Sequence, residues 1–157
     1  MLLWMQLTLA HVGAAGGGKA VARSGFDALV EMYIQRSSAY ARCQTRGFRT
    51  EEALLEWLTR QSGRTPAVAV LADSRGCAMD SETFATWIGK RRDEGAQHLV
   101  FAIGPASGWS AAARAQAKLL LSLGPLTMAH TLARLVLAEQ LYRALTILAG
   151  HPYHAAH

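Results

Sequence analysis

Runs of apolar residues recur along the chain at the length of buried β-strands. Three of them are almost continuously apolar and close on Gly or Asp, namely Leu7 to Val12, Ala67 to Asp73 and His98 to Gly104. Such runs are typical of strands that are covered on both faces, as in a parallel sheet. The segment from Ala39 to Thr45 is more polar, and we interpret it as a weaker candidate for an edge strand.

Helical patterns fill the intervals between these strands. They cover Val21 to Ile34, Thr50 to Gln61, Ser81 to Glu94 and Ser110 to Leu120. Thr50 and either Asp80 or Ser81 are placed to cap the helices that follow them. The alternation of strands and helices predicts an α/β fold with a parallel sheet, in a single domain over residues 1–157. Ligands of such folds bind where loops leave the carboxyl ends of the strands.

The most apolar helical pattern begins near Leu132. A stripe at helical spacing contains Leu137, Leu141, Leu145 and Leu148. The remaining faces are also largely apolar, so we expect a sheet to cover one side and a second subunit the other, which predicts a homodimer. Gly150 and Pro152 end the helix. Tyr153 and His154 are then displayed just beyond its C-terminus.

Composition and charge narrow the range of partners. A hydrophobic content of 51% fits a globular chain, and the formal net charge is +5 with a pI near 9.7. A basic surface attracts polyanions, of which nucleic acid is the natural candidate. Arginines gather in one stretch, at Arg36, Arg42, Arg46 and Arg49. The alternative is that these charges form an ordinary solvated face.

The cysteines and the apolar runs indicate in which cellular compartment the protein is expected. Cys43 and Cys77 lie far apart in the sequence, outside metal-ligand spacing, and two cysteines do not make a disulfide scaffold. No apolar run is long enough to cross a membrane, and the first residues are interpreted as a buried strand rather than a signal peptide. We therefore expect a cytoplasmic protein without a membrane partner.

Two motifs suggest other chemistry. The Gly-rich segment from Gly13 to Ala20 matches a phosphate loop as far as Lys19, but Ala20 stands where Ser or Thr would bind magnesium. A nucleotide hydrolase is thus an alternative, and a flexible strand-to-helix turn is favoured. Asp73, Asp80 and Glu82 have the spacing of a turn and a helix start rather than of a metal cluster, so no metal is expected.

Four segments carry a resemblance to a known family. They are "AEQLYRA" from Ala138, "HPYH" from His151, "FAIGPASG" from Phe101 and "LSLGPLTMAHTLAR" from Leu121. In this pattern the chain resembles the ribosomal large subunit methyltransferase H family, SPOUT-class enzymes that methylate a pseudouridine of the large-subunit rRNA. The turn "DSRG" at Asp73 and the helix start "DSETFA" at Asp80 are similar to that family as well.

The resemblance implies a fold, a reaction and partners. The fold is a parallel sheet flanked by helices with a C-terminal trefoil knot. The reaction is methyl transfer from S-adenosylmethionine to N3 of a pseudouridine in helix 69 of 23S rRNA, on the assembled ribosome. The enzyme is a homodimer in which each active site borrows residues from the neighbouring subunit.

The resemblance also implies roles for individual residues. Arg143 would stabilise negative charge on the uracil ring, Tyr153 would pack on the target base, and His154 would contact it or take its proton. The cofactor would be bordered by Ala72, Gly104, Leu123, Gly124, Pro125, Leu126, Thr127 and Met128. Gly104 is expected to allow backbone to approach the ligand closely.

The chain departs from the family pattern at two of these places. Ala72 stands where Leu is usual, and Pro105 replaces a glycine and so lacks an amide donor. A protein that keeps the fold and binds ribosomes without catalysis is therefore a second alternative beside the nucleotide hydrolase.

Overall fold

The computed structural model describes residues 2–13, 25–61 and 65–156. Five strands form one sheet: β1 (Leu2–Val12), β2 (Ala41–Phe48), β3 (Val68–Ala78), β4 (His98–Ile103) and β5 (Leu119–Ser122). The helices are α1 (Gly25–Ser37), α2 (Glu51–Arg60), α3 (Ser81–Asp93), α4 (Ala111–Gln116) and α5 (His130–Leu148). No helix in these ranges is long and apolar enough to cross a membrane.

The sheet is parallel throughout, with the strand order β2-β1-β4-β3-β5. The three apolar runs form its three inner strands, and every residue of β4 is buried. The more polar β2 lies at an edge. The predicted α/β fold with a parallel sheet is therefore confirmed, including the place of the edge strand.

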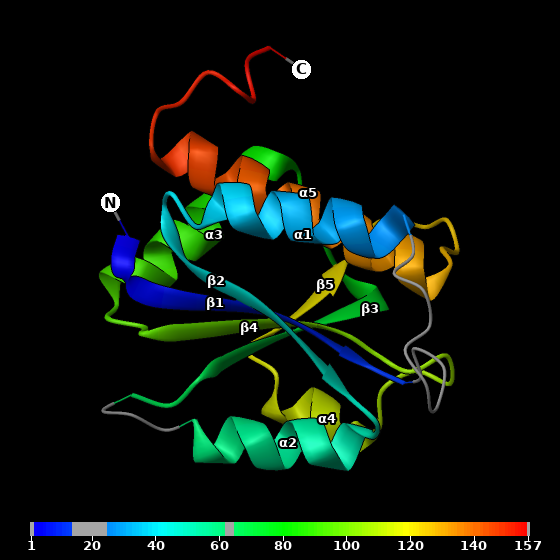
Figure 1. Ribbon diagram of the computed structural model, residues 1–157. Coiled ribbons are helices and arrows are strands. Elements are labelled where there is room, and N and C mark those ends of the chain that lie inside the picture. Colours follow the sequence, from blue (N-terminus) through cyan, green and yellow to red (C-terminus); the bar gives the residue numbers. More distant parts are fainter. Residues whose placement is uncertain (1, 14–24, 62–64, 157) are drawn as a thin grey trace.

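Helices cover both faces of the sheet (Figure 1). On one face lie α1, α3 and α5, and on the other lie α2 and α4. Leu137, Leu141 and Leu145 of α5 are at most 2% exposed, and they share a core cluster with Phe101 of β4. Trp57 of α2 belongs to the core cluster of the opposite face. The leucine stripe thus anchors α5 on the sheet, as its spacing predicts.

The predicted helix ends are confirmed by their hydrogen bonds. The Thr50 hydroxyl accepts from the backbone N–H of Ala53, and the Asp80 carboxylate accepts from that of Thr83. Gly150 has a φ of 71°, which favours glycine, and the N–H of His151 donates to the carbonyl of Thr146. This is the αL ending expected at a C-terminal glycine.

Two predicted helices differ from the observed ones. The helix expected over Ser110 to Leu120 is wrong in its second half, because α4 ends at Gln116 and Leu119–Ser122 form β5. A short apolar run can pair as a strand or continue a helix, and here pairing with β3 decides. The helix expected over Val21 to Ile34 continues to Ser37, and its first four residues lie outside the described ranges. Most of the Gly-rich segment also lies outside them.

A break in β3 shapes the end of the sheet. The pairing of β3 with β5 shifts between Ala72 and Cys77, and both residues pair with Leu121. The intervening residues leave the ladder as a bulge, which re-aims side chains at a sheet edge. At Gly76 an added Cβ would lie 2.5 Å from the carbonyl oxygen of Leu120. Glycine is therefore required for the two backbones to approach.

We predict that Gly76→Ala lowers the free energy of unfolding by about 1–3 kcal/mol, because backbone of β5 cannot yield to the new methyl group as a side chain could. Gly25→Ala is the matched control, since no atom of the described residues lies within 4 Å of its added Cβ, and it should change stability by less than about 0.5 kcal/mol. Urea denaturation of both variants measures this. Equal stabilities would show that β3 and β5 are not in such close contact.

Candidate functional site

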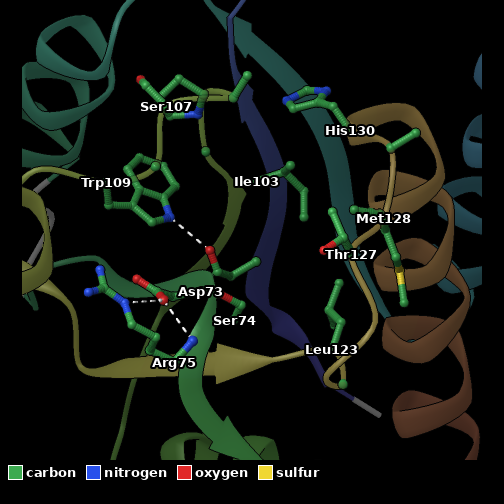
Figure 2. Close-up of a pocket in the computed structure, with 18 of the residues that line it drawn as sticks. Asp73, Ser74, Arg75, Ile103, Ser107, Trp109, Leu123, Thr127, Met128 and His130 are labelled. Carbon is green, nitrogen blue, oxygen red and sulfur yellow. Dashed lines mark hydrogen bonds and ion pairs between the residues drawn. The ribbon is translucent and has the colours of Figure 1, made fainter.

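A pocket of about 680 Å³ opens at the carboxyl ends of β3, β4 and β5. This volume is in the range of small-molecule sites, and the position is where parallel sheets bind ligands. Figure 2 shows Trp109, Asp73 and Arg75 on one side of it and Leu123, Thr127 and Met128 on the other, with Ile103 between them. The pocket thus lies between the loops that follow three neighbouring strands.

All eight residues that the resemblance assigns to the cofactor line this one pocket. They are Ala72, Gly104, Leu123, Gly124, Pro125, Leu126, Thr127 and Met128. They come from β3 and from the loops that follow β4 and β5. Their convergence gives the assignment a geometric basis, although the contacts with a cofactor stay a prediction.

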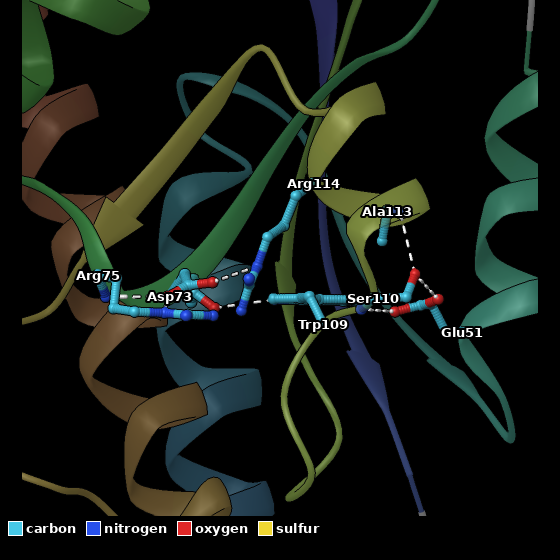
Figure 3. Close-up of polar contacts among 8 residues, drawn as sticks. Glu51, Asp73, Arg75, Trp109, Ser110, Ala113 and Arg114 are labelled. Atoms are coloured by element: carbon cyan, nitrogen blue, oxygen red, sulfur yellow. Dashed lines mark hydrogen bonds and ion pairs between the residues drawn. The ribbon is translucent and has the colours of Figure 1, made fainter.

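One wall of the pocket is fastened by Trp109, which the sequence analysis did not single out. Its indole is 6% exposed, and Nε1 donates to the carbonyl oxygen of Ala72 at 2.9 Å. This bond ties the loop after β4 to the end of β3. Ser110, the next residue, donates through its backbone N–H to Glu51 Oε1 at 2.8 Å. The loop is therefore held to α2 as well (Figure 3).

An ion pair completes this wall. The Asp73 side chain is 6% exposed, and it accepts from Arg114 Nε at 3.0 Å and from the backbone N–H of Arg75 at 2.9 Å. A carboxylate buried to this degree needs such partners. Asp73 is thereby used in a turn and an ion pair, and Asp80 in a helix cap, which are the structural roles expected from their spacing.

The reason for a glycine at position 104 differs from the one expected. An added Cβ there would lie 2.7 Å from Cε2 of Trp109. Gly104 therefore makes room for the indole, and a bulky substitution would displace Trp109 before it met any ligand. Loss of binding in such a variant would not separate the two effects.

The three predicted catalytic residues lie together at the far end of α5. Arg143 donates through Nη2 to Glu139 Oε1 at 2.7 Å, and the Tyr153 hydroxyl donates to the same oxygen at 3.0 Å. The Arg143 guanidinium lies 5.0 Å from the centre of the Tyr153 ring. The tail after Gly150 therefore folds back on its own helix, and Glu139 holds the cluster together.

Hydrogen bonding fixes how His154 is protonated in this arrangement. Arg143 Nη1 lies 3.0 Å from His154 Nδ1, and a guanidinium can only donate. His154 Nδ1 must therefore accept, which leaves the proton on Nε2, 3.6 Å from Glu82 Oε1. While Arg143 makes this bond, the Nδ1 lone pair is not available to take a proton from a substrate.

Tyr153 is held in its neutral form. Burial, followed by the hydrogen bond and charge of Glu139, raises the pKa of its hydroxyl well above the usual range. A hydroxyl that stays protonated can donate and pack but cannot act as a base near neutral pH. This fits the packing role predicted for Tyr153.

The pocket and the Arg143 cluster lie at opposite ends of α5. His130 and Ala133 line the pocket at the start of the helix, and Arg143 follows 13 residues after His130, which at 1.5 Å per residue is about 20 Å. The two sets of predicted site residues are therefore not brought together within one chain.

A cluster of polar side chains lies behind the pocket, where β1 ends. Arg134 pairs with Asp27 at 3.2 Å, and the rings of His11 and His130 are 6.1 Å apart. Burial, with smaller contributions from Arg134 and His130, lowers the pKa of His11 to about 4. Gly47 makes room for this ring, since an added Cβ would lie 2.8 Å from His11 Nε2.

The lowered pKa of His11 predicts a loss of stability in acid. As the pH falls from about 6.5 to about 4, the unfolded chain binds a proton at His11 that the folded chain does not, so the free energy of unfolding decreases. Solvent partly screens the charge on this half-buried ring. We therefore expect the acid-induced decrease in the free energy of unfolding to be about 1–2 kcal/mol smaller in His11→Gln than in the wild-type protein. Urea denaturation at pH 7 and pH 4.5 measures it. Identical pH dependence in both proteins would contradict a buried neutral His11.

Comparison with known proteins identifies the family of this chain. Residues 5–154 match the family model described as predicted SPOUT methyltransferase. The chain is 46% identical over 134 residues to ribosomal RNA large subunit methyltransferase H of Koribacter versatilis, which covers 85% of this chain and 91% of that protein. It is 49% identical over 128 residues to the protein of the same name from Sinorhizobium fredii, covering 82% of this chain and 75% of that protein.

A solved structure supports the fold. The SpoU methyltransferase AviRb from Streptomyces viridochromogenes, determined in complex with AdoMet, superposes with a TM-score of 0.50 and 14% identity. The match covers 96% of this chain and 60% of that one, and at this identity it bears on the fold alone. From the family model, the two relatives and the shared fold together, the chain belongs to the SPOUT methyltransferases and, among them, to the ribosomal RNA large subunit methyltransferase H family.

Proposed function

We propose that this protein transfers a methyl group from S-adenosylmethionine to N3 of a pseudouridine in helix 69 of 23S rRNA, on assembled ribosomes in the cytoplasm. The observation that carries the proposal is the convergence of all eight predicted cofactor residues on one pocket at the carboxyl ends of the strands. Family membership supplies the reaction class.

The pocket fits the cofactor in size and in lining. Ile103, Leu123 and Ala133 give apolar walls, and the loop from Leu123 to Met128 offers backbone groups. Neither departure from the family pattern fills the space, because Ala72 is smaller than Leu and Pro105 lies in a turn closed by the N–H of Gly108. When bound, S-adenosylmethionine supplies a methyl group on a sulfonium cation.

The chain's own residues must handle the charge and the proton on the target base. Removing the N3 proton leaves negative charge on the uracil ring, which the guanidinium of Arg143 is suited to stabilise. If Arg143 turns from His154 to the ring, the Nδ1 lone pair of His154 becomes free to take that proton. Glu139 acts as a positioning residue, because it accepts hydrogen bonds from both Arg143 and Tyr153.

Exposed apolar side chains support a homodimer. Phe26 and Leu29 of α1 and Leu132 of α5 are at least 40% exposed, and Leu126 of the pocket loop is 80% exposed. Phe26 and Leu29 flank Asp27, whose ion pair with Arg134 places the start of α1 beside the start of α5, and the two helices pack side by side (Figure 1). A second copy that covers this surface could bring its own Arg143 cluster to the pocket, about 20 Å from the Arg143 of the same chain.

Unpaired arginines support an RNA substrate. Arg60, Arg75, Arg91, Arg92, Arg114, Arg134 and Arg143 each have a carboxylate partner within 4 Å. Arg36, Arg42, Arg46 and Arg49 are exposed and have no ion pair among the residues that the structure describes. No Asp or Glu occurs between residues 35 and 50. This segment, which includes edge strand β2, offers free positive charge to phosphate groups.

Subunit complementation tests the composite site. Arg143→Ala should lower methylation by about a hundredfold while cofactor binding persists, and Thr127→Trp should fill the pocket and abolish binding. Neither homodimer should methylate ribosomes at more than about a hundredth of the wild-type rate. Co-expression of the two variants should restore about a quarter of the wild-type activity, because half of the dimers are mixed and each mixed dimer has one intact site.

The readout is methylation of ribosomes from a strain that lacks the enzyme, with mass spectrometry of the rRNA to locate the methyl group. Mixed dimers, isolated with two different tags, that remain inactive would contradict the composite site. Methylation at a different nucleotide would contradict the proposed target.

Salt dependence tests the arginine surface. Arg42→Gln/Arg49→Gln should weaken ribosome binding about tenfold or more and lower the slope of log K against log salt by about two, because two phosphate contacts are lost. Arg60→Gln/Arg92→Gln removes the same charge from paired arginines and should change the slope little. Ribosome pelleting over a range of salt concentrations measures both. Equal slopes in the two double variants would assign these arginines to an ordinary solvated face.

A further inference from the structure

One ring nitrogen of His130 is hydrogen-bonded to the backbone, and the other is not. It is the first residue of α5 and is half-buried, and its Nε2 lies 3.2 Å from the carbonyl oxygen of Val12. A carbonyl oxygen can only accept, so Nε2 carries a proton and donates it. In the neutral ring, Nδ1 then keeps a lone pair that can accept a hydrogen bond.

The other ring nitrogen belongs to a residue that lines the pocket. His130 Nδ1 has no hydrogen bond to any described residue, and it is not among the fully buried atoms that lack a partner. His130 lines the pocket next to the loop that ends at Met128 and Ala129. Figure 2 shows its ring at the rim of the same cavity as Ile103 and Thr127.

The other side of the ring is occupied by His11 and Arg134, whose Nδ1 and Nε atoms are buried and have no hydrogen-bond partner among the described residues. His11 meets it edge-on at 6.1 Å, and Arg134, which is 9% exposed, is paired with Asp27. The bond to Val12 holds the ring from the end of β1. The bond to Val12 in β1 therefore sets the orientation of His130, and Nδ1 is left without a hydrogen-bond partner among the described residues.

A ligand that fills this pocket would remove water from Nδ1. A buried acceptor without a donor costs free energy, so the ligand must offer an N–H at this place or bind more weakly. S-adenosylmethionine has N–H donors at its α-ammonium group and at its adenine amino group. We propose that His130 is a cofactor-positioning residue whose Nδ1 accepts a hydrogen bond from one of these N–H groups, an inference that rests on the proposed methyltransferase function.

Two substitutions separate the two ring nitrogens. In His130→Gln the amide can still donate to Val12 but leaves nothing at the position of Nδ1, whereas in His130→Asn the amide oxygen lies near the position of Nδ1 and the bond to Val12 is lost. The proposal expects His130→Gln to keep the melting temperature and weaken S-adenosylmethionine binding about tenfold. It expects His130→Asn to lower the melting temperature and keep the affinity within about threefold of wild type.

Isothermal calorimetry and thermal unfolding of the purified protein give both readouts without any methyl transfer. The reverse pattern, with affinity lost in His130→Asn and kept in His130→Gln, would overturn the proposal and leave His130 a purely structural residue. Wild-type affinity in both variants would also overturn it. If the wild-type protein itself does not bind S-adenosylmethionine, the proposed function fails first, and that result is distinct from the other two.

A second ligand identifies the donor. 5′-Methylthioadenosine keeps the adenine and lacks the amino-acid part of the cofactor. If His130→Gln weakens its binding as much as that of S-adenosylmethionine, the donor is the adenine amino group. If only S-adenosylmethionine binding is weakened, the donor is the α-ammonium group.

Discussion

The packing of α5 on the sheet is the constraint on which the rest of the site depends. Its leucine stripe is buried against β4 and the neighbouring strands, and this burial fixes both ends of a 19-residue helix at once. The first turn forms a wall of the pocket, and the last turns carry Arg143. Because a helix is stiff, the two places cannot approach each other within one chain. The proposed dimer would therefore serve the chemistry as well as the stability of this fold.

Charges around the site are arranged so that each buried one has a partner. Asp73 faces Arg114, Arg134 faces Asp27, and Glu139 faces Arg143. Burying an unpaired charge would cost several kcal/mol, so these pairs determine where the loops and the tail can lie. The exposed arginines around β2 differ, since they have no ion pair among the described residues, and Arg46 lies over the ring of Trp57 at 5.2 Å.

The sequence predicted the elements that depend on local pattern. Buried strands, capped helices and the glycine ending of α5 follow from residues within a few positions of one another. The strand β5 could not be predicted in this way, because Leu119–Ser122 is short and uniformly apolar and becomes a strand through its pairing with β3. The trefoil knot stays a prediction from the family, because strand pairing and helix packing do not by themselves define how the chain is threaded.

The site could be predicted only in part, for a similar reason. The resemblance named the pocket residues, and the structure brings them together from β3 and from the loops after β4 and β5. Trp109 and Glu51 were missed, because their partners lie 37 and 59 residues away and no local motif marks them. The sequence analysis also did not consider the distance between the pocket and Arg143. That distance follows from the number of residues between them along one continuous helix.

The most direct measurement of the central claim is an experimental structure of the protein with S-adenosylmethionine bound. The account predicts a dimer in which the sulfonium methyl group lies in the pocket at the ends of β3, β4 and β5, nearer to Arg143 of the partner subunit than to Arg143 of its own chain. A cofactor bound elsewhere, or a methyl group nearer to the Arg143 of its own chain, would contradict it.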